Sequence, residues 1–197
     1  WTSGTYRWTR SVDWLGGEID RLDPPVARTE LLRRWLVAFG PETETDIRWW
    51  TGWTARETRA ALATVPHVVV ELDEGTGLVL AGDEATTGPP DPWAALLPTL
   101  DPTTMGWKER DWYLGPHERI LFDSAGNAGP TVWWEGRVVG GWSQRPDGEI
   151  AYRLLEDVAA DALAAIKKEA VRVQAWIGEA LFSPSFLPPF QRELAKA

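Results

Sequence analysis

The chain lacks cysteine entirely, so none of its 197 residues can form a disulfide bond or a thiolate metal site. Histidine is almost as scarce, because His67 and His117 are the only two and lack the spacing of zinc ligands. No apolar run reaches the roughly eighteen residues of a membrane span, and the first residues lack the apolar core of a signal peptide. We therefore expect a cytoplasmic protein without a metal, a cofactor or a membrane segment.

Catalytic motifs are missing as well. The sequence contains no phosphate loop of the glycine-lysine type, and no nucleophile-elbow pattern surrounds Ser3, Ser124 or Ser143. Carboxylate pairs such as Asp101 with Asp111 are too common to indicate acid-base catalysis. The residues alone therefore leave the catalytic residues unknown.

Basic residues are outnumbered, 20 against 29 acidic ones, which gives a formal net charge of −9. Most of the excess lies in residues 67–105, which carry seven acidic groups and no basic one. Neither flank offers the basic stripe that dominates tight non-specific binding to DNA. The acidic segment 67–105 could instead dock a basic protein partner, although solvated acidic loops are common.

Three helix patterns and a hairpin pattern follow one another between residues 24 and 84. Thr43 with Asp46, and Thr54 with Glu57, have the spacing of helix N-caps. The run "HVVVELDEGTGLVLAG" predicts a β-hairpin. Apolar side chains form the inner faces of the three helices: Leu31, Leu32, Trp35, Leu36 and Phe39, then Ile47, Trp49 and Trp50, then Ala60, Ala61, Leu62 and Val65. This order predicts a winged helix-turn-helix domain over residues 24–84.

In a winged helix the third helix can offer its outer face to DNA. Here that face would carry Arg56, Arg59 and Thr58, and each arginine could bind a phosphate or a guanine edge. Glu57 between the arginines would oppose this. So would the acidic hairpin, which carries Glu71, Asp73 and Glu74. DNA binding and protein contact both remain open for this domain.

The second half predicts a sheet followed by a long helix. After a proline-rich connector over residues 83–102 come four β-type runs, "RILFD", "TVWWE", "RVVGGW" and "EIAYRL", separated by turn residues. Apolar positions at helical spacing follow: Val158, Ala162, Ile166, Ala170, Val173 and Ile177. We expect an antiparallel β-barrel or meander domain over residues 92–180. A tail over residues 181–197 should be ordered at its aromatic start and frayed after Gln191.

Four basic residues of this half are candidates for a nucleic-acid surface. Lys108 and Arg110 lie in the loop "MGWKERDWYLGPHER", and Arg137 and Arg145 lie in the meander. Functional groups are often carried by loops of this composition, although an amphipathic turn packed on the sheet is the simpler reading. Trp133 and Trp134 must point to opposite faces of a strand, so at most one could stack on a base.

Three long stretches resemble the winged-helix DNA glycosylases of the AlkZ type, actinobacterial members above all. They are "LLRRWLVAFGPETETDIRWWTGWT", "LLPTLDPTTMGWKERDWYLGPH" and "GNAGPTVWWEGRVVGGWSQRPDGE". The resemblance covers roughly residues 1–180. It implies tandem winged helices followed by a β-barrel that bind double-stranded DNA, damaged or undamaged. The activity it implies is DNA repair by cleavage of the N-glycosidic bond of alkylated purines, including those in cross-links.

The catalytic signature of that family, Gln-x-Gln or Gln-x-Asp, has no match here. The only glutamines are Gln144, Gln174 and Gln191, and none has glutamine or aspartate two positions later. The signature belongs to an N-terminal region, and this chain starts at Trp1 rather than methionine. We therefore expect the C-terminal portion of a glycosylase-like protein, inactive alone. Residues 1–23, with Trp1, Tyr6, Trp8 and Trp14, would end a preceding module.

The fold class that we predict is α+β, with a winged helix-turn-helix followed by a small β-barrel or meander and a long C-terminal helix. The leading functional hypothesis is a DNA-binding portion of a glycosylase, with Arg56, Arg59, Lys108, Arg110, Arg137 and Arg145 facing the DNA. The alternative is a non-enzymatic winged-helix module for transcriptional regulation or protein–protein interaction.

Overall fold

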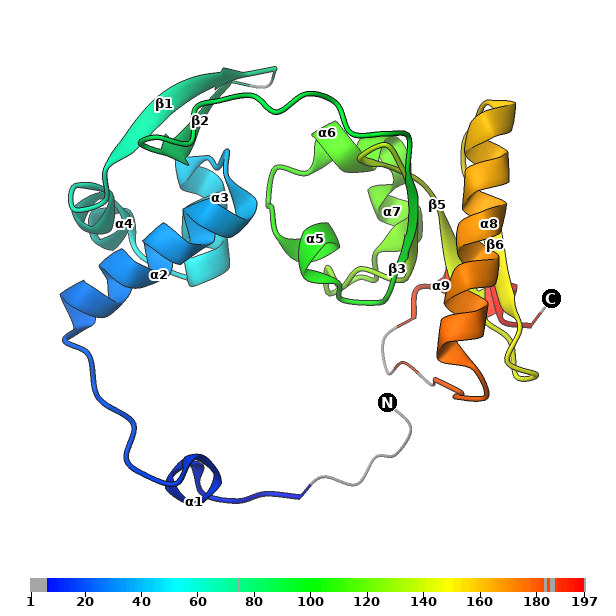
Figure 1. Ribbon diagram of the computed structural model, residues 1–197, viewed down its shortest axis with the longest axis horizontal. Coiled ribbons are helices and arrows are strands. Elements are labelled where there is room, and N and C mark those ends of the chain that lie inside the picture. Colours follow the sequence, from blue (N-terminus) through cyan, green and yellow to red (C-terminus); the bar gives the residue numbers. More distant parts are fainter. Residues whose placement is uncertain (1–6, 74, 183, 185–186, 197) are drawn as a thin grey trace. The chain divides into compact units, whose positions relative to one another are not determined.

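The computed structural model describes residues 7–73, 75–182, 184 and 187–196 (Figure 1). The chain divides into two compact units between Thr87 and Gly88. We call residues 7–87 the helix–hairpin unit and residues 88–196 the sheet unit. Helices and antiparallel strands occur in both, so the chain is of the α+β class as predicted. Trp1, Tyr6 and Glu74, which the sequence analysis singled out, lie outside the described residues.

The helix–hairpin unit contains the predicted three helices and hairpin. Its elements are α1 (Ser11–Leu15), α2 (Pro24–Phe39), α3 (Glu44–Thr51), α4 (Ala55–Leu62), β1 (His67–Leu72) and β2 (Gly75–Leu80). β1 and β2 pair in antiparallel fashion over their full length, from His67 opposite Leu80 to Leu72 opposite Gly75. Both predicted capping boxes are present, at Thr43 with Asp46 and at Thr54 with Glu57. These caps fix where α3 and α4 begin.

The core of this unit lies between α2, α3, α4 and the hairpin (Figure 1). Its buried members are Leu32, Trp35, Leu36, Ile47, Ala61, Leu62 and Val65. Trp35 also lies between two other rings, Phe39 at 4.3 Å and Trp50 at 4.0 Å between centroids. Leu31, Trp49, Trp50 and Ala60 were expected to face inward but are exposed, although the Trp50 ring still packs on Trp35. Leu31 and Ala60 each sit at the margin of their helix's apolar stripe, which the core does not reach.

The sheet unit is built on four antiparallel strands in the order β3-β4-β5-β6. The strands are β3 (Ala94–Leu97), β4 (Thr131–Trp134), β5 (Arg137–Gln144) and β6 (Ile150–Leu154). The helices are α5 (Pro102–Met105), α6 (Asp111–Leu114), the 3₁₀ turn η1 (Gly115–His117), α7 (Glu118–Leu121), α8 (Ala160–Ile177) and α9 (Pro189–Leu194). The predicted meander is therefore present in β4, β5 and β6.

The predicted barrel is wrong, because the sheet stays open with β3 and β6 at its edges. Helices cover both faces instead. α8 packs on one face through Ala162, Ile166, Ala170 and Val173, as its spacing predicted (Figure 1). α6, α7 and α9 contribute to the core on the other face. With apolar side chains buried on both sides, closing the sheet on itself would gain nothing.

Neighbouring residues of one strand serve these two cores. Trp133 and Val138 belong to the α6 side, whereas Val132 and Val139 belong to the α8 side. Trp134 is half-buried against the α8 side, so neither tryptophan of this pair is the exposed stacking platform that the sequence had suggested.

The run "RILFD" was expected to be a strand and is instead α7 with one isolated bridge, Phe122 to Ala128. The missing strand comes from the predicted connector, where Ala94–Leu97 pairs with β4. Four apolar residues are too few to distinguish a strand from a helical turn by pattern. Fraying after Gln191 is also wrong, because α9 continues and buries Leu194.

Gly140 provides a test of the close packing in β5. A Cβ atom there would collide with the Arg153 carbonyl oxygen and lie 3.0 Å from Leu154 Cα, and backbone cannot move aside. Gly140→Ala should therefore destabilise the sheet unit by about 1–3 kcal/mol, measured by chemical denaturation. The control is Gly88→Ala, where the new methyl group would meet nothing within 4 Å. Equal effects of the two substitutions would contradict this packing.

Candidate nucleic-acid interface

The outer face of α4 carries two exposed arginines. α4 begins at Ala55 because the Thr54 hydroxyl accepts the Glu57 backbone N–H at 3.3 Å. Arg56 and Arg59 then point to solvent. Thr58, which was expected beside them, is fully buried and donates to the Thr54 carbonyl oxygen at 3.1 Å. The polar surface that α4 offers is thus its arginine pair.

Glu57 does not place its charge freely between these arginines. Its carboxylate accepts the Thr54 backbone N–H at 3.0 Å and the Thr54 hydroxyl at 2.8 Å. Its other oxygen pairs with Arg28 of α2 at 2.8 Å. The hydrogen bonds from Thr54, with smaller help from Arg28, lower the pKa of Glu57. The carboxylate is therefore committed to the start of α4 and to α2, which weakens the repulsion expected from the sequence.

The two arginines differ in how free they are. Arg59 lies 3.4 Å from Glu44, and its side chain keeps 72% of its exposure. Such exposed pairs contribute little, so a phosphate could replace Glu44 at small cost. Arg56 makes no salt bridge within the part of the chain that the structure describes.

On α2 the basic residues are occupied. Arg33 and Arg34 both bond to Glu30, at 2.8 Å and 2.7 Å, and these bonds lower the pKa of Glu30 to about 2. The cluster keeps one net positive charge, but both of its guanidinium groups are already bonded to Glu30. Arg56 has no such salt bridge among the described residues, so α4 offers the more accessible guanidinium group.

The hairpin remains acidic where it is described. Glu71 and Asp73 are exposed at and beside the turn, and Glu74 lies outside the described residues. A phosphate backbone would be repelled from this end of the hairpin.

In the sheet unit, the four predicted basic residues have different surroundings. Lys108 and Arg137 are exposed, whereas Arg145 pairs with Glu149 at 2.8 Å. Arg110 is only 6% exposed and lies over the Phe122 ring, 4.8 Å from its centroid. Arg110 was expected to face DNA, but the structure buries its guanidinium group against the Phe122 ring, so it offers no exposed charge.

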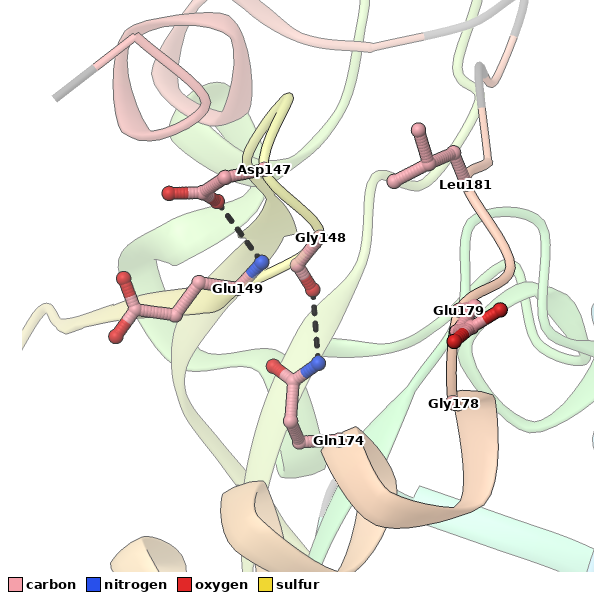
Figure 2. A pocket seen from close by; sticks show the side chains of 7 residues that line it. All are labelled: Asp147, Gly148, Glu149, Gln174, Gly178, Glu179 and Leu181. Carbon is pink, nitrogen blue, oxygen red and sulfur yellow. Dashed lines mark hydrogen bonds between the residues drawn. The ribbon is translucent and has the colours of Figure 1, made fainter.

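A hollow of about 480 Å³ lies between the β5–β6 turn and the end of α8 (Figure 2). Asp147, Glu149 and Glu179 line it with carboxylates. Gln174 closes its floor by donating to the Gly148 carbonyl oxygen at 2.8 Å, as Figure 2 shows. An acidic hollow repels phosphate, so it is no nucleic-acid site. The sequence predicted the "RPDG" turn but not this hollow, whose two walls are far apart along the chain.

Other chemistries find little support in the described residues. No group of three or more histidine, aspartate or glutamate side chains in that part of the chain could hold a metal ion. Within the same residues, no helix has the length and apolar character needed to cross a membrane.

Comparison with known proteins identifies the family of this chain. The sequence model of the family described as "DNA glycosylase AlkZ-like" matches residues 1–176, so the chain belongs to the AlkZ-like DNA glycosylase family. It is thereby related to DNA-repair glycosylases. No curated protein matches the chain in sequence.

One solved structure is similar, that of Streptomyces sahachiroi DNA glycosylase AlkZ, with 25% sequence identity and a TM-score of 0.67. The likeness covers 79% of this chain and 45% of that one. The chain therefore spans less than half the length of this structure.

The role of Glu57 in holding α4 can be tested by pH. Because its pKa is lowered on folding, its charged form stabilises the folded state above the pKa of the unfolded chain. That contribution is lost as pH falls through the lowered pKa. Glu57→Gln should therefore reduce the free energy of unfolding near neutral pH, and the difference from the unsubstituted chain should shrink on acidification.

The measurement is urea denaturation at several pH values, with Glu18→Gln, an exposed side chain in the same unit, as control. A difference that stays constant down to strongly acidic pH would exclude the charged capping interaction.

Proposed function

We propose that this chain is the DNA-binding portion of a glycosylase-like repair protein that acts on alkylated purines or cross-links. Residues 24–84 would form a winged helix that docks on duplex DNA through α4. The observation that carries the proposal is the exposed arginine pair of α4, in a chain of the AlkZ-like family.

The order of elements supports the winged-helix assignment. Three helices precede an antiparallel hairpin, and α4 is the third of the three. Its inner side is buried through Thr58, Ala61 and Leu62, so only the opposite side remains for a partner. In DNA-binding proteins of this kind that side enters or borders the major groove.

The proposed contacts are fewer than the sequence suggested. Arg56 and Arg59 would bind phosphates, with Lys108 and Arg137 adding positive charge on the sheet unit. Arg145 would contribute less because Glu149 already neutralises it. Arg110 is left out because it is buried.

Cleavage of the glycosidic bond is not expected from these residues. Hydrolysis needs a positioned water molecule. In the AlkZ-type glycosylases that the sequence resembles, a Gln-x-Gln or Gln-x-Asp pair positions this water. Here Gln144 and Gln174 bond to the backbone of the β5–β6 turn, and Gln191 is fully buried. All three glutamines serve the architecture of the sheet unit.

A second candidate function rests on the acidic hairpin. Glu71 and Asp73 are exposed, and residues 67–105 have no basic group to balance them. A winged helix with such a hairpin could contact a basic protein in repair or transcription instead of DNA.

Fluorescence anisotropy with a short duplex, with and without an abasic-site analogue, tests the first function. We expect binding that weakens with added salt, and tighter binding to the damaged duplex. Replacing Arg56 and Arg59 by alanine should make the negative slope of log K against log[salt] shallower by about 2, because each lost phosphate contact reduces its magnitude by roughly 0.9.

The matched control replaces Arg33 and Arg34 by alanine, which removes the same charge from the same unit at residues already paired with Glu30. If both double variants lose the same slope, α4 is not the contact. If the unsubstituted chain fails to bind even at low salt, the protein-contact function is favoured.

The absence of catalysis is a separate prediction. Incubation of the chain with a duplex containing a 7-methylpurine should release no base above the rate without protein, measured as abasic sites cleaved by alkali. Release at a protein-dependent rate would mean that residues other than the missing glutamine pair position the water.

A further inference from the structure

A second, larger pocket lies in the sheet unit, between the C-terminal half of α8 and the strands beneath it. Its volume is about 530 Å³, which is in the range of small-molecule sites. Its lining is mostly apolar. Trp142 of β5, Trp176 of α8 and Phe182 after α8 supply the aromatic walls, while Leu96, Val173 and Ile177 supply aliphatic ones.

Most polar side chains of this pocket already have partners. Trp142 Nε1 donates to the Leu97 carbonyl oxygen at 2.8 Å, and the Thr99 hydroxyl donates to that of Ala128 at 2.8 Å. Arg172 makes two bonds of 2.7 Å to Glu169. A ligand would therefore find little polar chemistry here, and its buried part must be apolar.

Gln144 holds the wall that follows α8. Its amide nitrogen donates to the Ala180 carbonyl oxygen at 2.9 Å, and its amide oxygen accepts the Phe182 N–H at 2.9 Å. The amide group of Gln144 therefore has partners for its nitrogen and its oxygen, and it holds the backbone of Phe182 at the edge of the pocket. The pocket is preformed on this side rather than left to an unattached tail.

The two tryptophans of the pocket differ sharply in exposure. Trp142 is 8% exposed, whereas Trp176 is 80% exposed. One indole is thus fixed in the core, and the other stands in solvent at the pocket mouth. An aromatic ring entering the pocket would cover apolar surface of Trp176 that water now contacts.

This pocket is separate from the proposed DNA contacts. Among the described lining residues Arg172 is the basic one, and its two short bonds go to Glu169, whose carboxylate is only 14% exposed and would repel a phosphate. Three lining residues, Ile177, Phe182 and Pro184, also lie beyond residues 1–176, the stretch that the family's sequence model matches.

We propose that this pocket binds a small, uncharged, planar aromatic molecule, which contacts Trp142, Trp176 and Phe182. Aromatic walls favour a flat ring through offset or edge-to-face packing, which an aliphatic chain cannot reproduce. The saturated polar groups select against charged ligands. Binding of this aromatic molecule would be a function of the sheet unit in addition to the proposed DNA contacts.

The experiment titrates the full chain with 1-aminoanthracene and follows the fluorescence of the probe. We expect saturable binding of one probe per chain. Trp176→Ala should weaken binding by about tenfold or more, as expected for loss of an aromatic anchor. Trp14→Ala is the matched control, because Trp14 is equally exposed at 80% but lies in the other unit.

Fluorine NMR of the chain labelled with 5-fluorotryptophan locates the probe. The resonance assigned to Trp176 by its alanine variant should shift on saturation, and that of Trp14 should not. Because Trp176 is exposed, its removal does not threaten folding.

Two results would overturn the proposal: equal binding by Trp176→Ala, or equally tight competition by decan-1-ol. Failure of the chain to bind DNA would leave this result unaffected, so the two proposals stand or fall separately.

Discussion

The helix–hairpin unit depends on one carboxylate, that of Glu57. It completes the capping box of α4 by accepting two hydrogen bonds from Thr54, and it joins α4 to α2 through Arg28. The carboxylate stays charged, and Arg56 is among the groups that lower its pKa. This one residue thus helps to set where α4 begins and ties the helix to its neighbour. A glutamate between two arginines looks poorly suited to anions, but these bonds turn its oxygens toward Thr54 and Arg28.

In the sheet unit the corresponding constraint is burial on both faces of an open sheet. Val132 and Val139 serve the α8 side, whereas Trp133 and Val138 serve the other. β4 and β5 are therefore apolar at successive positions, which a one-sided sheet would not allow. Gly140 in the middle of β5 lets the neighbouring backbone of β6 approach closely. The architecture leaves the ends of the strands and the end of α8 as the places where the surface is hollowed.

Local signals were sufficient for the helices and caps but not for long-range features. Thr43, Thr54 and the spacing of α8 predicted their elements correctly, because capping and periodicity depend on residues within a few positions. The class of fold followed from the order of those elements. The barrel and the strand at 119–123 were wrong, since pairing and closure depend on partners distant in sequence. The burial of Arg110 and Thr58 was missed for the same reason, and the pockets combine segments that no local pattern connects.

The helix–hairpin unit separates its charges, with arginines on α4 and acidic side chains at the far end of the hairpin strand β1. Such a separation of charge gives the unit an electric dipole, which the field of a nearby polyanion would orient. The field would turn the α4 side toward the anion and the hairpin end away before any contact forms. The orientation of approach would then be selected during diffusion, even though the chain as a whole carries a net negative charge. A protein of negative net charge can in this way approach a negatively charged polymer in one preferred orientation, because the positive charge of the nearest face acts more strongly than the net charge of the whole chain.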